Sequence, residues 1–430
     1  MMDQLLNEDL VSLIEKARVL SRKTDLSSDL RNRILADIVQ EIHQRKDEII
    51  RISTEDYALA KAAELDEALL QRLKLDADKI QSSINGLEKL IALEDPIGQV
   101  EFVRELDEQL VLTKKTYPIG VIGVIFEARP DAFIQVIGLA IKTNNFMILK
   151  PGKEAQRTCS YVMAMVHNVL LKHHVPLEML TLLHSRSQID DLLKLDQYID
   201  LIIPRGSKQL VEYIQQNTNI PVMGHADGVC HIYVDQISSL QQTLNVIVDA
   251  KIQYAAACNA VETILVHQQI ASQFLPILIS RLEELDIEIY ADEKISALLT
   301  RNFTSPKSWS FEYSNHSISL KIVGDLQEAI DHINRYGSHH TDVIITADPQ
   351  HAATFMQQVD SANVYHNCST RFADGFRYGF GAEVGISTSK ILPRGPVAIE
   401  GLTTYKYHIT GDFQIVEDYA KGIRKFKHAI

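Results

Sequence analysis

The sequence predicts an α/β protein with two doubly wound parallel sheets in tandem and a smaller third element. Short apolar runs alternate with amphipathic helical stretches in two series, the first beginning after Pro118 and the second at VCHIYVD. Continuous apolar strands separated by helices are typical of parallel sheets that helices cover on both faces. The chain has 430 residues, more than the ~250–300 that one hydrophobic core supports. Two or more domains are therefore expected.

Residues 1–95 are expected to be helical. In LVSLIEKARVL and LRNRILADIVQEIHQRKDEIIRI, apolar residues recur every three or four positions, and good helix formers stand between them. Residues 100–117 then alternate apolar and polar side chains in parts, which predicts an antiparallel ribbon. We expect this ribbon to extend toward a partner subunit.

The two series of strands follow the ribbon. The first is expected in IGVIGVIF, FMILK, MLTLLH, YIDLIIP and IPVMG. The second is expected in VCHIYVD, AVETILVH, LDIEIY, SLKIV, TDVIIT and ANVYH. No low-complexity linker and no clear internal repeat separates them, so the sequence alone predicts tandem modules without defining the boundary.

The charge and the cysteines exclude several classes of protein. Lys and Arg number 43 against 56 Asp and Glu, a formal net charge of −13, so broad binding to nucleic acid or to an anionic membrane is not expected. The N-terminus is acidic, unlike a secretory signal, and charged residues interrupt the richest apolar stretch. The four cysteines show no CxxC spacing, which argues against structural zinc and against a disulfide framework. We expect a cytoplasmic protein without a metal site.

Polar residues follow two strand ends of the first series. Lys150, Gly152 and Lys153 come directly after FMIL, and Gly206 with Ser207 leads from LIIPR into a helix. Open parallel sheets bind ligands outside the carboxyl ends of their strands, and a Gly-Ser pair at a helix start offers backbone N–H groups to a phosphate. Each feature alone is weak, because lysine after a strand is usually a solvated surface residue. GxGxxG and the P-loop sequence are both absent.

Cys258 stands in YAAACNAVETILVH, between three alanines and a predicted strand. A lone cysteine near small residues is usually a buried hydrophobe. Here Asn259 follows directly, which puts the thiol at a polar junction, and the alanines would let a ligand approach closely. A thiolate in this place would be a nucleophile toward a carbonyl or acyl carbon. Packing and chemistry both remain open at this point.

The segment 367–396 is the least core-like part of the chain. It combines arginines and hydroxyls with five glycines, and long polar loops of this kind are commonly functional. Arginines and hydroxyls suit carboxylates and phosphates. Arg371, Arg394 and Ser369 are therefore our candidates for binding the charged groups of a substrate. The alternative is a mobile surface loop.

The motifs taken together resemble those of the aldehyde dehydrogenase superfamily. PIGVIGVIFEARPDA, LKPGKEA, LIIPRGS, the cysteine before TILVH, and AIDHINRYGSHHTDVIIT follow one another as they do there. HADGVCHIYVD, YGFGAEVGIST and RGPVAIEGLTTYKY are similar to the branch of that superfamily that reduces L-glutamyl 5-phosphate in proline biosynthesis. The similarity runs from about residue 5 to the C-terminus.

The resemblance implies an aldehyde dehydrogenase-like domain organisation. An NADP(H)-binding domain would occupy residues 1–225, and a catalytic domain carrying the cysteine would occupy 226–365. A return segment, 366–404, would line the active site. The ribbon 100–117 and the C-terminal residues 405–430 would form a small oligomerisation element.

The resemblance also implies roles for single residues in cofactor binding. Lys150 with its Pro-Gly turn, and Gly206 with Ser207, fall where the superfamily holds the adenosine ribose and the phosphates. Glu312 falls near the position of the carboxylate that holds the nicotinamide ribose. The implied cofactor is NADPH/NADP+, and Lys150 and Lys153 are compatible with its 2′-phosphate.

Cys258 falls at the position of the superfamily's nucleophile, and two departures from the superfamily pattern surround it. Hydrolytic members keep a glutamate as general base where this chain has VMGHADGVC, and an enzyme that exchanges its thioester with phosphate needs no activated water. The superfamily's oxyanion asparagine would fall at Glu127 or Ala128, where no amide is present. The N–H of Cys258, with Arg129 or Asn259, is the candidate for this task.

The implied reaction is NADPH-dependent reduction of L-glutamyl 5-phosphate to L-glutamate 5-semialdehyde and phosphate through a thioester on Cys258. A homo-oligomer is expected, as is association with glutamate 5-kinase, which makes the labile substrate. Two alternatives remain. One is a hydrolytic NAD(P)-dependent aldehyde dehydrogenase, and the other is a non-catalytic dinucleotide-binding scaffold.

Overall fold

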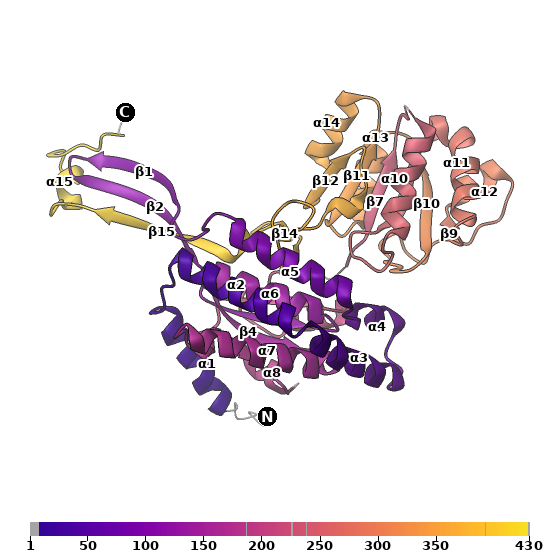
Figure 1. Cartoon of the computed structure of the whole chain (residues 1–430). Helices are drawn as coiled ribbons and strands as arrows, with labels where there is room; N and C mark the ends of the chain where they lie inside the picture. The colour runs from indigo at the N-terminus through magenta and orange to yellow at the C-terminus, as the bar shows by residue number, and fades with distance from the viewer. Residues whose placement is uncertain (1–7, 186, 225–226, 238, 392, 429–430) are drawn as a thin grey trace, which may run out of the picture.

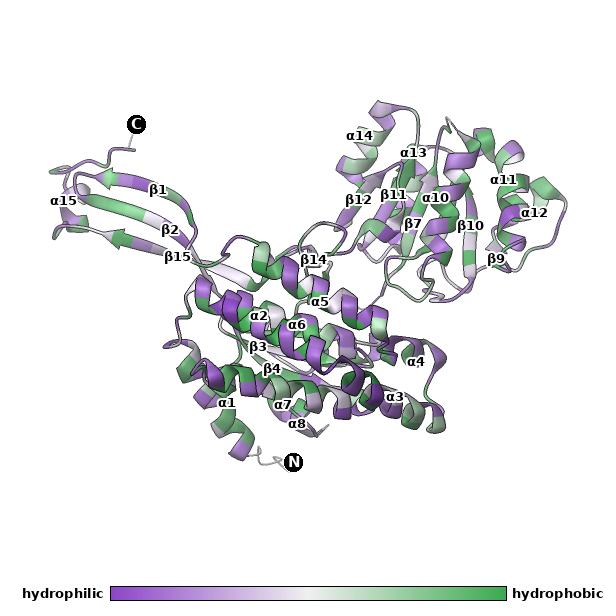
Figure 2. Ribbon diagram, in the orientation of Figure 1, coloured by the Kyte–Doolittle hydropathy of each residue, from purple (hydrophilic) through white to green (hydrophobic). Residues whose placement is uncertain are grey.

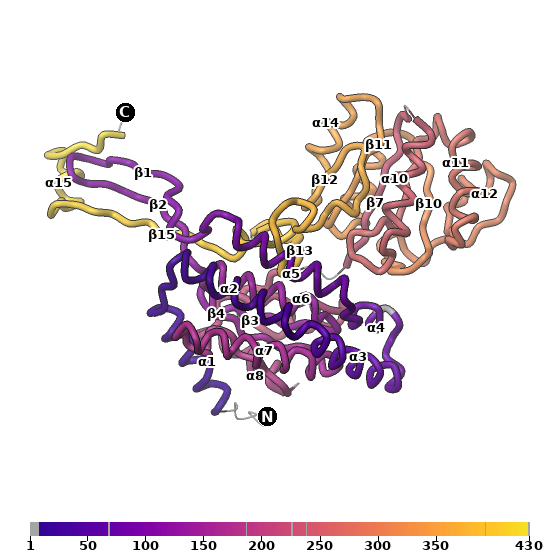
Figure 3. Tube along the Cα trace, viewed as in Figure 1, coloured from indigo at the N-terminus to yellow at the C-terminus, as the bar shows by residue number. Residues whose placement is uncertain are grey.

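The computed structural model describes residues 8–185, 187–224, 227–237, 239–391 and 393–428. Three bodies are distinct in Figure 1: a helix-rich unit, a second α/β unit, and a thin sheet that projects away from both. Figure 3 shows that the chain enters the second unit before β7 (Cys230–Val234) and returns to the first between β12 (Asn363–His366) and β13 (Gly385–Ser387). The domain boundary expected at residues 225–226 lies outside the described residues.

The N-terminal region is helical, as predicted. Its helices are α1 (Glu8–Ser21), α2 (Ser28–Gln44), α3 (Lys46–Ala62), α4 (Glu67–Leu73) and α5 (Ala77–Ala92). Ser27 caps α2 by accepting from the N–H of Leu30, and Asp76 caps α5 by accepting from that of Lys79. The apolar stripe of α2 is buried at Ile34, Leu35, Ile38 and Ile42. The 3.6-residue period of the sequence therefore becomes a packed face.

The first parallel sheet has the strand order β5-β4-β3-β6. Its strands are β3 (Val121–Phe126), β4 (Phe146–Pro151), β5 (Leu180–Leu182) and β6 (Leu201–Arg205). The helices that follow these strands are α6 (Pro130–Lys142), α7 (Gln156–Lys172), α8 (Ser187–Leu192) and α9 (Lys208–Gln216). Helices α6 and α7 pack side by side, and α2, α3 and α5 pack over them. All residues of β3 and β4 are buried.

The expected strand IPVMG is wrong as a strand of its own. Val222 forms only an isolated bridge with Ile202. Pro221 has no N–H to donate, so a continuous ladder cannot form at this position.

The second parallel sheet has the order β12-β11-β7-β8-β10-β9. Its strands are β7 (Cys230–Val234), β8 (Val261–His267), β9 (Glu288–Ala291), β10 (Ser317–Val323), β11 (Thr341–Ile345) and β12 (Asn363–His366). Its helices are α10 (Leu240–Ile252), α11 (Gln268–Glu283), α12 (Glu293–Leu299), α13 (Leu326–Tyr336) and α14 (Pro349–Gln358). Ile232 and Val234 pack in one apolar cluster, while Tyr233 between them packs in another. Successive side chains thus bury opposite faces, and the prediction of two helix-covered parallel sheets is confirmed.

The projecting sheet is antiparallel and consists of β1 (Val100–Asp107), β2 (Leu110–Pro118) and β15 (Thr403–Thr410). The ribbon predicted at 100–117 is therefore confirmed, and β15 extends it from the C-terminal side. The short helix α15 (Val416–Ala420) lies near its far end (Figure 1). Val103, Tyr407 and Ile409 are exposed, and Figure 2 shows apolar and polar residues mixed along the strands without a covering layer.

The described residues of the return segment 366–404 pack against the rest of the protein, unlike a solvated surface loop. It contains β13 (Gly385–Ser387) and β14 (Gly395–Val397), which pair with each other. Val384 and Val397 pack into the core of the first unit, and Thr370 and Arg371 are buried. None of the described helices has the length and hydropathy of a membrane-spanning segment.

A buried histidine gives the second unit a predictable pH dependence. His332 on α13 lies among the rings of Trp309 and Tyr336, and its Nδ1 is 3.0 Å from Nζ of Lys321. Burial, and then its positive neighbours, lower the pKa of His332 to about 2. Below about pH 6.5, the ordinary pKa of histidine, His332 binds a proton in the unfolded protein but stays neutral in the folded protein. The free energy of unfolding therefore falls as the pH falls from about 6.5 toward 2.

We therefore expect His332 to account for a loss of about 2 kcal/mol in the free energy of unfolding between pH 6.5 and pH 4.5. Urea denaturation at a series of pH values measures it. In His332→Gln this part of the slope should disappear, whereas an unchanged slope would show that the histidine is protonated in the folded protein.

Candidate active site

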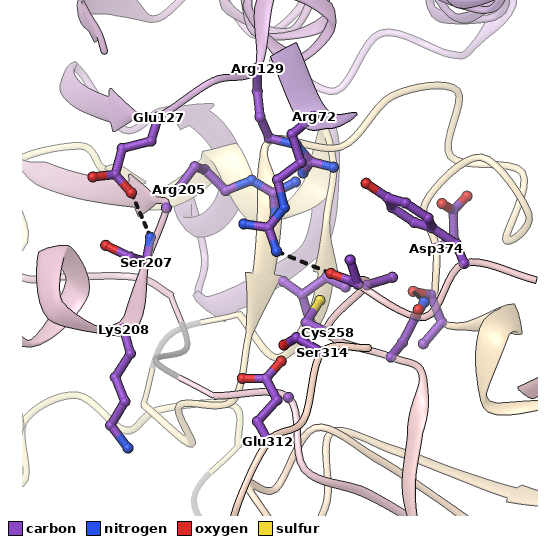
Figure 4. Close-up of a pocket in the computed structure, with 18 of the residues that line it drawn as sticks. Arg72, Glu127, Arg129, Arg205, Ser207, Lys208, Cys258, Glu312, Ser314 and Asp374 are labelled. Atoms are coloured by element: carbon purple, nitrogen blue, oxygen red, sulfur yellow. Dashed lines mark hydrogen bonds between the residues drawn. The ribbon is translucent and has the colours of Figure 1, made fainter. Parts of the chain in front are cut away.

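A cavity of 360 Å³ lies where the two units and the return segment meet. Its walls come from the ends of β3 and β6, from the turn before β8, from residues 312–314 and from the return segment (Figure 4). Cys258 lines this cavity. The carboxyl ends of parallel strands therefore form one wall, as expected for an open α/β sheet.

Cys258 is held in a turn between α10 and β8. The turn is closed by hydrogen bonds from Ala257 N to Tyr254 O (3.1 Å) and from Ala260 N to Ala257 O (2.9 Å). Gly228 packs directly against it, because a Cβ built at Gly228 would lie 2.1 Å from the carbonyl oxygen of Cys258. The hydrogen bonds of the turn and the contact with Gly228 thus restrict the backbone that carries the thiol.

The other three cysteines have different surroundings. Burial raises the pKa of the Cys159 and Cys230 thiols well above the ordinary value, and burial also raises the pKa of Cys368. None of the three lines the cavity described above. A raised pKa keeps a thiol protonated and unreactive. Among the four, Cys258 therefore has the placement that nucleophilic chemistry requires.

Four arginines line the same cavity: Arg72, Arg129, Arg205 and Arg371. Figure 4 shows the side chains of Arg72, Arg129 and Arg205 converging near Cys258. Burial opposes the charge of Arg129, but Asp131 and then Cys258 outweigh it and raise the pKa of Arg129. Burial and the neighbouring Arg129 lower the pKa of Arg205. Guanidinium groups close to a thiol favour the thiolate, which is the nucleophilic form.

Two hydrogen bonds fix the return segment onto the cysteine turn. Nδ2 of Asn259 donates to the carbonyl oxygen of Ala373 (2.8 Å), and Nε of Arg371 donates to Oε1 of Gln253 (2.8 Å). The amide nitrogen of Asn259 is therefore engaged in holding the segment, while its buried Oδ1 has no hydrogen-bond partner among the residues that the structure describes. Burial lowers the pKa of Arg371.

A second cavity of 440 Å³ adjoins the first, and Glu127 lines both. Lys150, Gly152 and Lys153 line the second cavity, so the structure brings these three predicted residues together. Lys150 lies in β4 and Gly152 and Lys153 follow its end, in a cavity that shares Glu127 with the cysteine cavity. The described residues contain no cluster of His, Cys, Asp or Glu that could hold a metal ion.

Gly206 and Ser207 line the first cavity at the start of α9. The N–H of Ser207 was expected to be available to a phosphate, but it donates to Oε2 of Glu127 (2.7 Å). A Cβ at Gly206 would lie 2.4 Å from the same carboxylate oxygen. The Glu127 side chain fills the space beside Gly206, and its carboxylate takes the place at the helix N-terminus that an anion would take.

Glu312 also lines the cysteine cavity, beside Ser314. The N–H of Ser314 donates to Oε1 of Glu262 (3.2 Å), and Nζ of Lys251 donates to Oε2 of Glu262 (2.8 Å). The Lys251–Glu262 pair is fully buried, and burial raises the pKa of Glu262 to about 7 in spite of its partner. This pair anchors the segment that presents Glu312.

Two of the predicted substrate-binding residues lie outside this cavity. Arg394 donates from Nη2 to the carbonyl and carboxylate oxygens of Asp360 (3.1 and 3.0 Å). Ser369 is buried and accepts from the N–H of Arg371 (3.2 Å). Residue type alone did not reveal this, because an arginine in a polar loop can serve an internal ion pair as well as a ligand.

The sequence analysis did not identify Arg72, Glu383 or the Lys251–Glu262 pair. Arg72 stands in an amphipathic helix, where nothing distinguishes it from a solvated residue, yet its Nη2 donates to Ala256 O across 184 positions of sequence (3.0 Å). Glu262 did carry a signal, since it is a charged residue in the mostly apolar stretch AVETILVH.

Comparison with known proteins gives the family. The model described as "Aldehyde dehydrogenase family" matches residues 3–301. A gamma-glutamyl phosphate reductase from Synechococcus elongatus is 50% identical over 390 residues, which cover 91% of this chain and 90% of the relative. One from Acetivibrio thermocellus is 48% identical over 401 residues, 93% of each.

Solved structures agree with this result. The crystal structure of gamma-glutamyl phosphate reductase from Thermotoga maritima has a TM-score of 0.88 and 32% identity, over 95% of this chain and 99% of that one. A glyceraldehyde-3-phosphate dehydrogenase from Methanocaldococcus jannaschii, complexed with NADP, shares the fold with a TM-score of 0.69 and 19% identity over 96% of each chain. The chain described here therefore belongs to the aldehyde dehydrogenase family and, within it, to the gamma-glutamyl phosphate reductases.

Proposed function

We propose that the chain reduces L-glutamyl 5-phosphate to L-glutamate 5-semialdehyde and phosphate, with NADPH as the reductant. The observation that carries the proposal is the meeting of Cys258 with four arginines in one cavity, beside a second cavity lined by lysines. A nucleophile among cations suits an acyl phosphate, because the leaving group is a multiply charged anion. The name of the relatives supports the choice of substrate.

Cys258 is the proposed nucleophile. Its thiolate attacks the acyl carbon, the bond to the phosphate oxygen breaks, and phosphate leaves as a thioester forms. The thioester keeps the acyl carbon in one place during the reduction, which makes that step effectively unimolecular. When the reduced product leaves, the bond between carbon and sulfur breaks and the thiolate is restored. Arg371 is the proposed contact for the departing phosphate, because it lines the cavity and is oriented by Gln253.

The second cavity is the proposed site of the dinucleotide, which supplies a hydride to the thioester carbon when bound. Lys150 and Lys153 would hold the adenosine ribose and its 2′-phosphate, and Glu312 would hold the nicotinamide ribose. Glu127 lines both cavities, and this shared wall supports the placement of one cofactor across the two. Arg129 is the proposed donor to the developing oxyanion, with the N–H of Cys258. Asn259 is proposed as a positioning residue, because its amide holds Ala373.

Assembly into a homo-oligomer through the projecting sheet is part of the proposal. The exposed side chains of Val103, Tyr407 and Ile409 on a sheet without a covering layer support it. Sedimentation equilibrium of the intact protein tests this part, and a monomer would contradict it. Association with glutamate 5-kinase is proposed from the lability of the substrate, and co-sedimentation of the two proteins tests it.

The reaction is best tested backward, because the acyl phosphate is labile. Purified protein is mixed with glutamate 5-semialdehyde and NADP+, and NADPH is followed by absorbance with and without phosphate. We expect NADPH to form only with phosphate. Formation without phosphate would mean that water takes the thioester, as in a hydrolytic aldehyde dehydrogenase, and no turnover at all would favour a non-catalytic scaffold.

A further inference from the structure

A third cavity of 270 Å³ continues the cysteine cavity, with which it shares Arg129, Arg205, Asp374 and Glu383 as walls. We name it the side compartment. Its other walls include Ser82 on α5, Asp131 and Gln135 on α6, and Phe376 and Arg377 of the return segment. Because the two cavities share these walls, the side compartment lies directly beside the cavity that contains Cys258.

The charges around the side compartment are balanced. Three guanidinium groups, those of Arg129, Arg205 and Arg377, face three carboxylates, those of Asp131, Asp374 and Glu383. Arg205 lies 3.7 Å from Glu383 and Arg377 lies 3.8 Å from Asp374, so these charges are partly paired within the wall. A plain dicarboxylate would be repelled by the acids, and an uncharged aldehyde would complement neither sign. A zwitterion, with an ammonium and a carboxylate on one carbon, complements both signs.

Three buried atoms at this place have no hydrogen-bond partner within the described residues: Oδ1 of Asp131, Nε of Arg129 and Nε of Arg205. Buried polar atoms are nearly always hydrogen-bonded, so an unpartnered acceptor beside an unpartnered donor marks a place for a ligand. The backbone sets up this arrangement. Ala128 has a φ of 45° and donates its N–H to Oε1 of Glu154, and Pro130 then begins α6. This bend puts Asp131 in the first turn of α6, at the compartment wall.

Arg377 is fixed in a way that leaves it able to bind. Its Nη1 donates to the carbonyl oxygen of Arg371 (2.6 Å) and lies 3.8 Å from Oδ2 of Asp374. These contacts orient the guanidinium plane through one nitrogen, and its side chain is 33% exposed. A guanidinium held at one corner can offer its other nitrogens to a carboxylate in the fork geometry.

We propose that the side compartment binds the amino-acid end of the substrate, with Asp131 accepting from the α-ammonium group and Arg377 donating to the α-carboxylate. The inference rests on the proposed function and deepens it, since it assigns the residues that select an α-amino acid over other aldehydes. The α-carbon is separated from the acyl carbon by three carbon–carbon bonds, roughly 4 Å in extended form. That reach is short enough for an adjoining compartment.

The test combines substrate analogues with variants of the intact enzyme, in the reverse reaction with NADP+ and phosphate. 5-Oxopentanoate lacks the ammonium group of glutamate 5-semialdehyde, and 4-aminobutanal lacks the carboxylate. We expect Asp131→Asn to lower kcat/KM for glutamate 5-semialdehyde about 100-fold, mainly through KM, and to leave kcat/KM for 5-oxopentanoate within about threefold. Asp78→Asn is the matched control. It removes an exposed acid from the first turn of α5 and should change neither value.

Arg377→Gln provides the complementary measurement. It also tests the proposed binding of the amino-acid end if Asp131→Asn does not fold. It should lower kcat/KM for glutamate 5-semialdehyde about 10-fold or more and leave that for 4-aminobutanal unchanged. Equal losses on the intact substrate and on the analogue would overturn the inference, because a merely structural role affects all substrates alike. Absence of phosphate-dependent turnover in the wild-type protein would instead overturn the proposed function.

Discussion

Replacement of Cys258 by alanine is expected to lower phosphate-dependent NADPH formation by a factor of about 10⁴ or more. The reason is chemical: without the sulfur no thioester forms, and the remaining groups can only bind and orient the substrate. The initial rate with glutamate 5-semialdehyde, NADP+ and phosphate measures the loss. The thermal unfolding midpoint should change little, because Cys258 is only half-buried.

Cys368→Ala is the matched control for this experiment. Cys368 is also half-buried, but it does not line the cavity, and burial raises the pKa of its thiol. Its alanine variant should keep wild-type turnover. A thiol reagent should inactivate the wild type, and substrate should slow the inactivation. Near-wild-type turnover of Cys258→Ala would refute the proposed mechanism entirely.

Replacement of Gly228 by alanine is expected to lower kcat about 100-fold, although it leaves every reacting group chemically unchanged. The new Cβ would lie 2.1 Å from the carbonyl oxygen, 2.4 Å from Cα and 2.6 Å from the carbonyl carbon of Cys258. These are backbone atoms, so the clash is relieved only when the turn that carries the thiol and the backbone at Gly228 move apart. A displacement of about 1 Å at a reacting atom costs on the order of 100-fold in rate.

Gly224→Ala in the same loop is the control. There the nearest atom to the new Cβ is Cγ of Pro204, 3.3 Å away, and a small shift of that ring accommodates the methyl group. We expect its kcat to stay within about threefold of wild type. The rate of alkylation of Cys258 should change with kcat in both variants. If both retained the same activity, the turn would not depend on close packing of Gly228.

Much of the fold could be predicted from periodicity. Apolar residues every three or four positions gave the N-terminal helices, and continuous apolar runs gave the strands of both parallel sheets, because burial on one or both faces leaves that pattern in the sequence. IPVMG failed since an apolar run does not show that Pro221 lacks the N–H a ladder needs. The pairing of β15 with β2 could not be derived from periodicity, which says nothing about partners distant in the chain.

The candidate active site could likewise be predicted only in part. The local sequence showed a thiol at Cys258 with small neighbours, and lysines at the end of β4. The order of the motifs indicated the family. The surroundings of the thiol could not be predicted, because they depend on hydrogen bonds between residues far apart in the sequence. Arg72 donates to Ala256 across 184 positions, and Asn259 donates to Ala373 across 114. The sequence by itself thus determined which groups can react. The tertiary structure alone decided which charges surround them, which N–H groups are already engaged and which arginines remain for a ligand, since these depend on packing between distant segments.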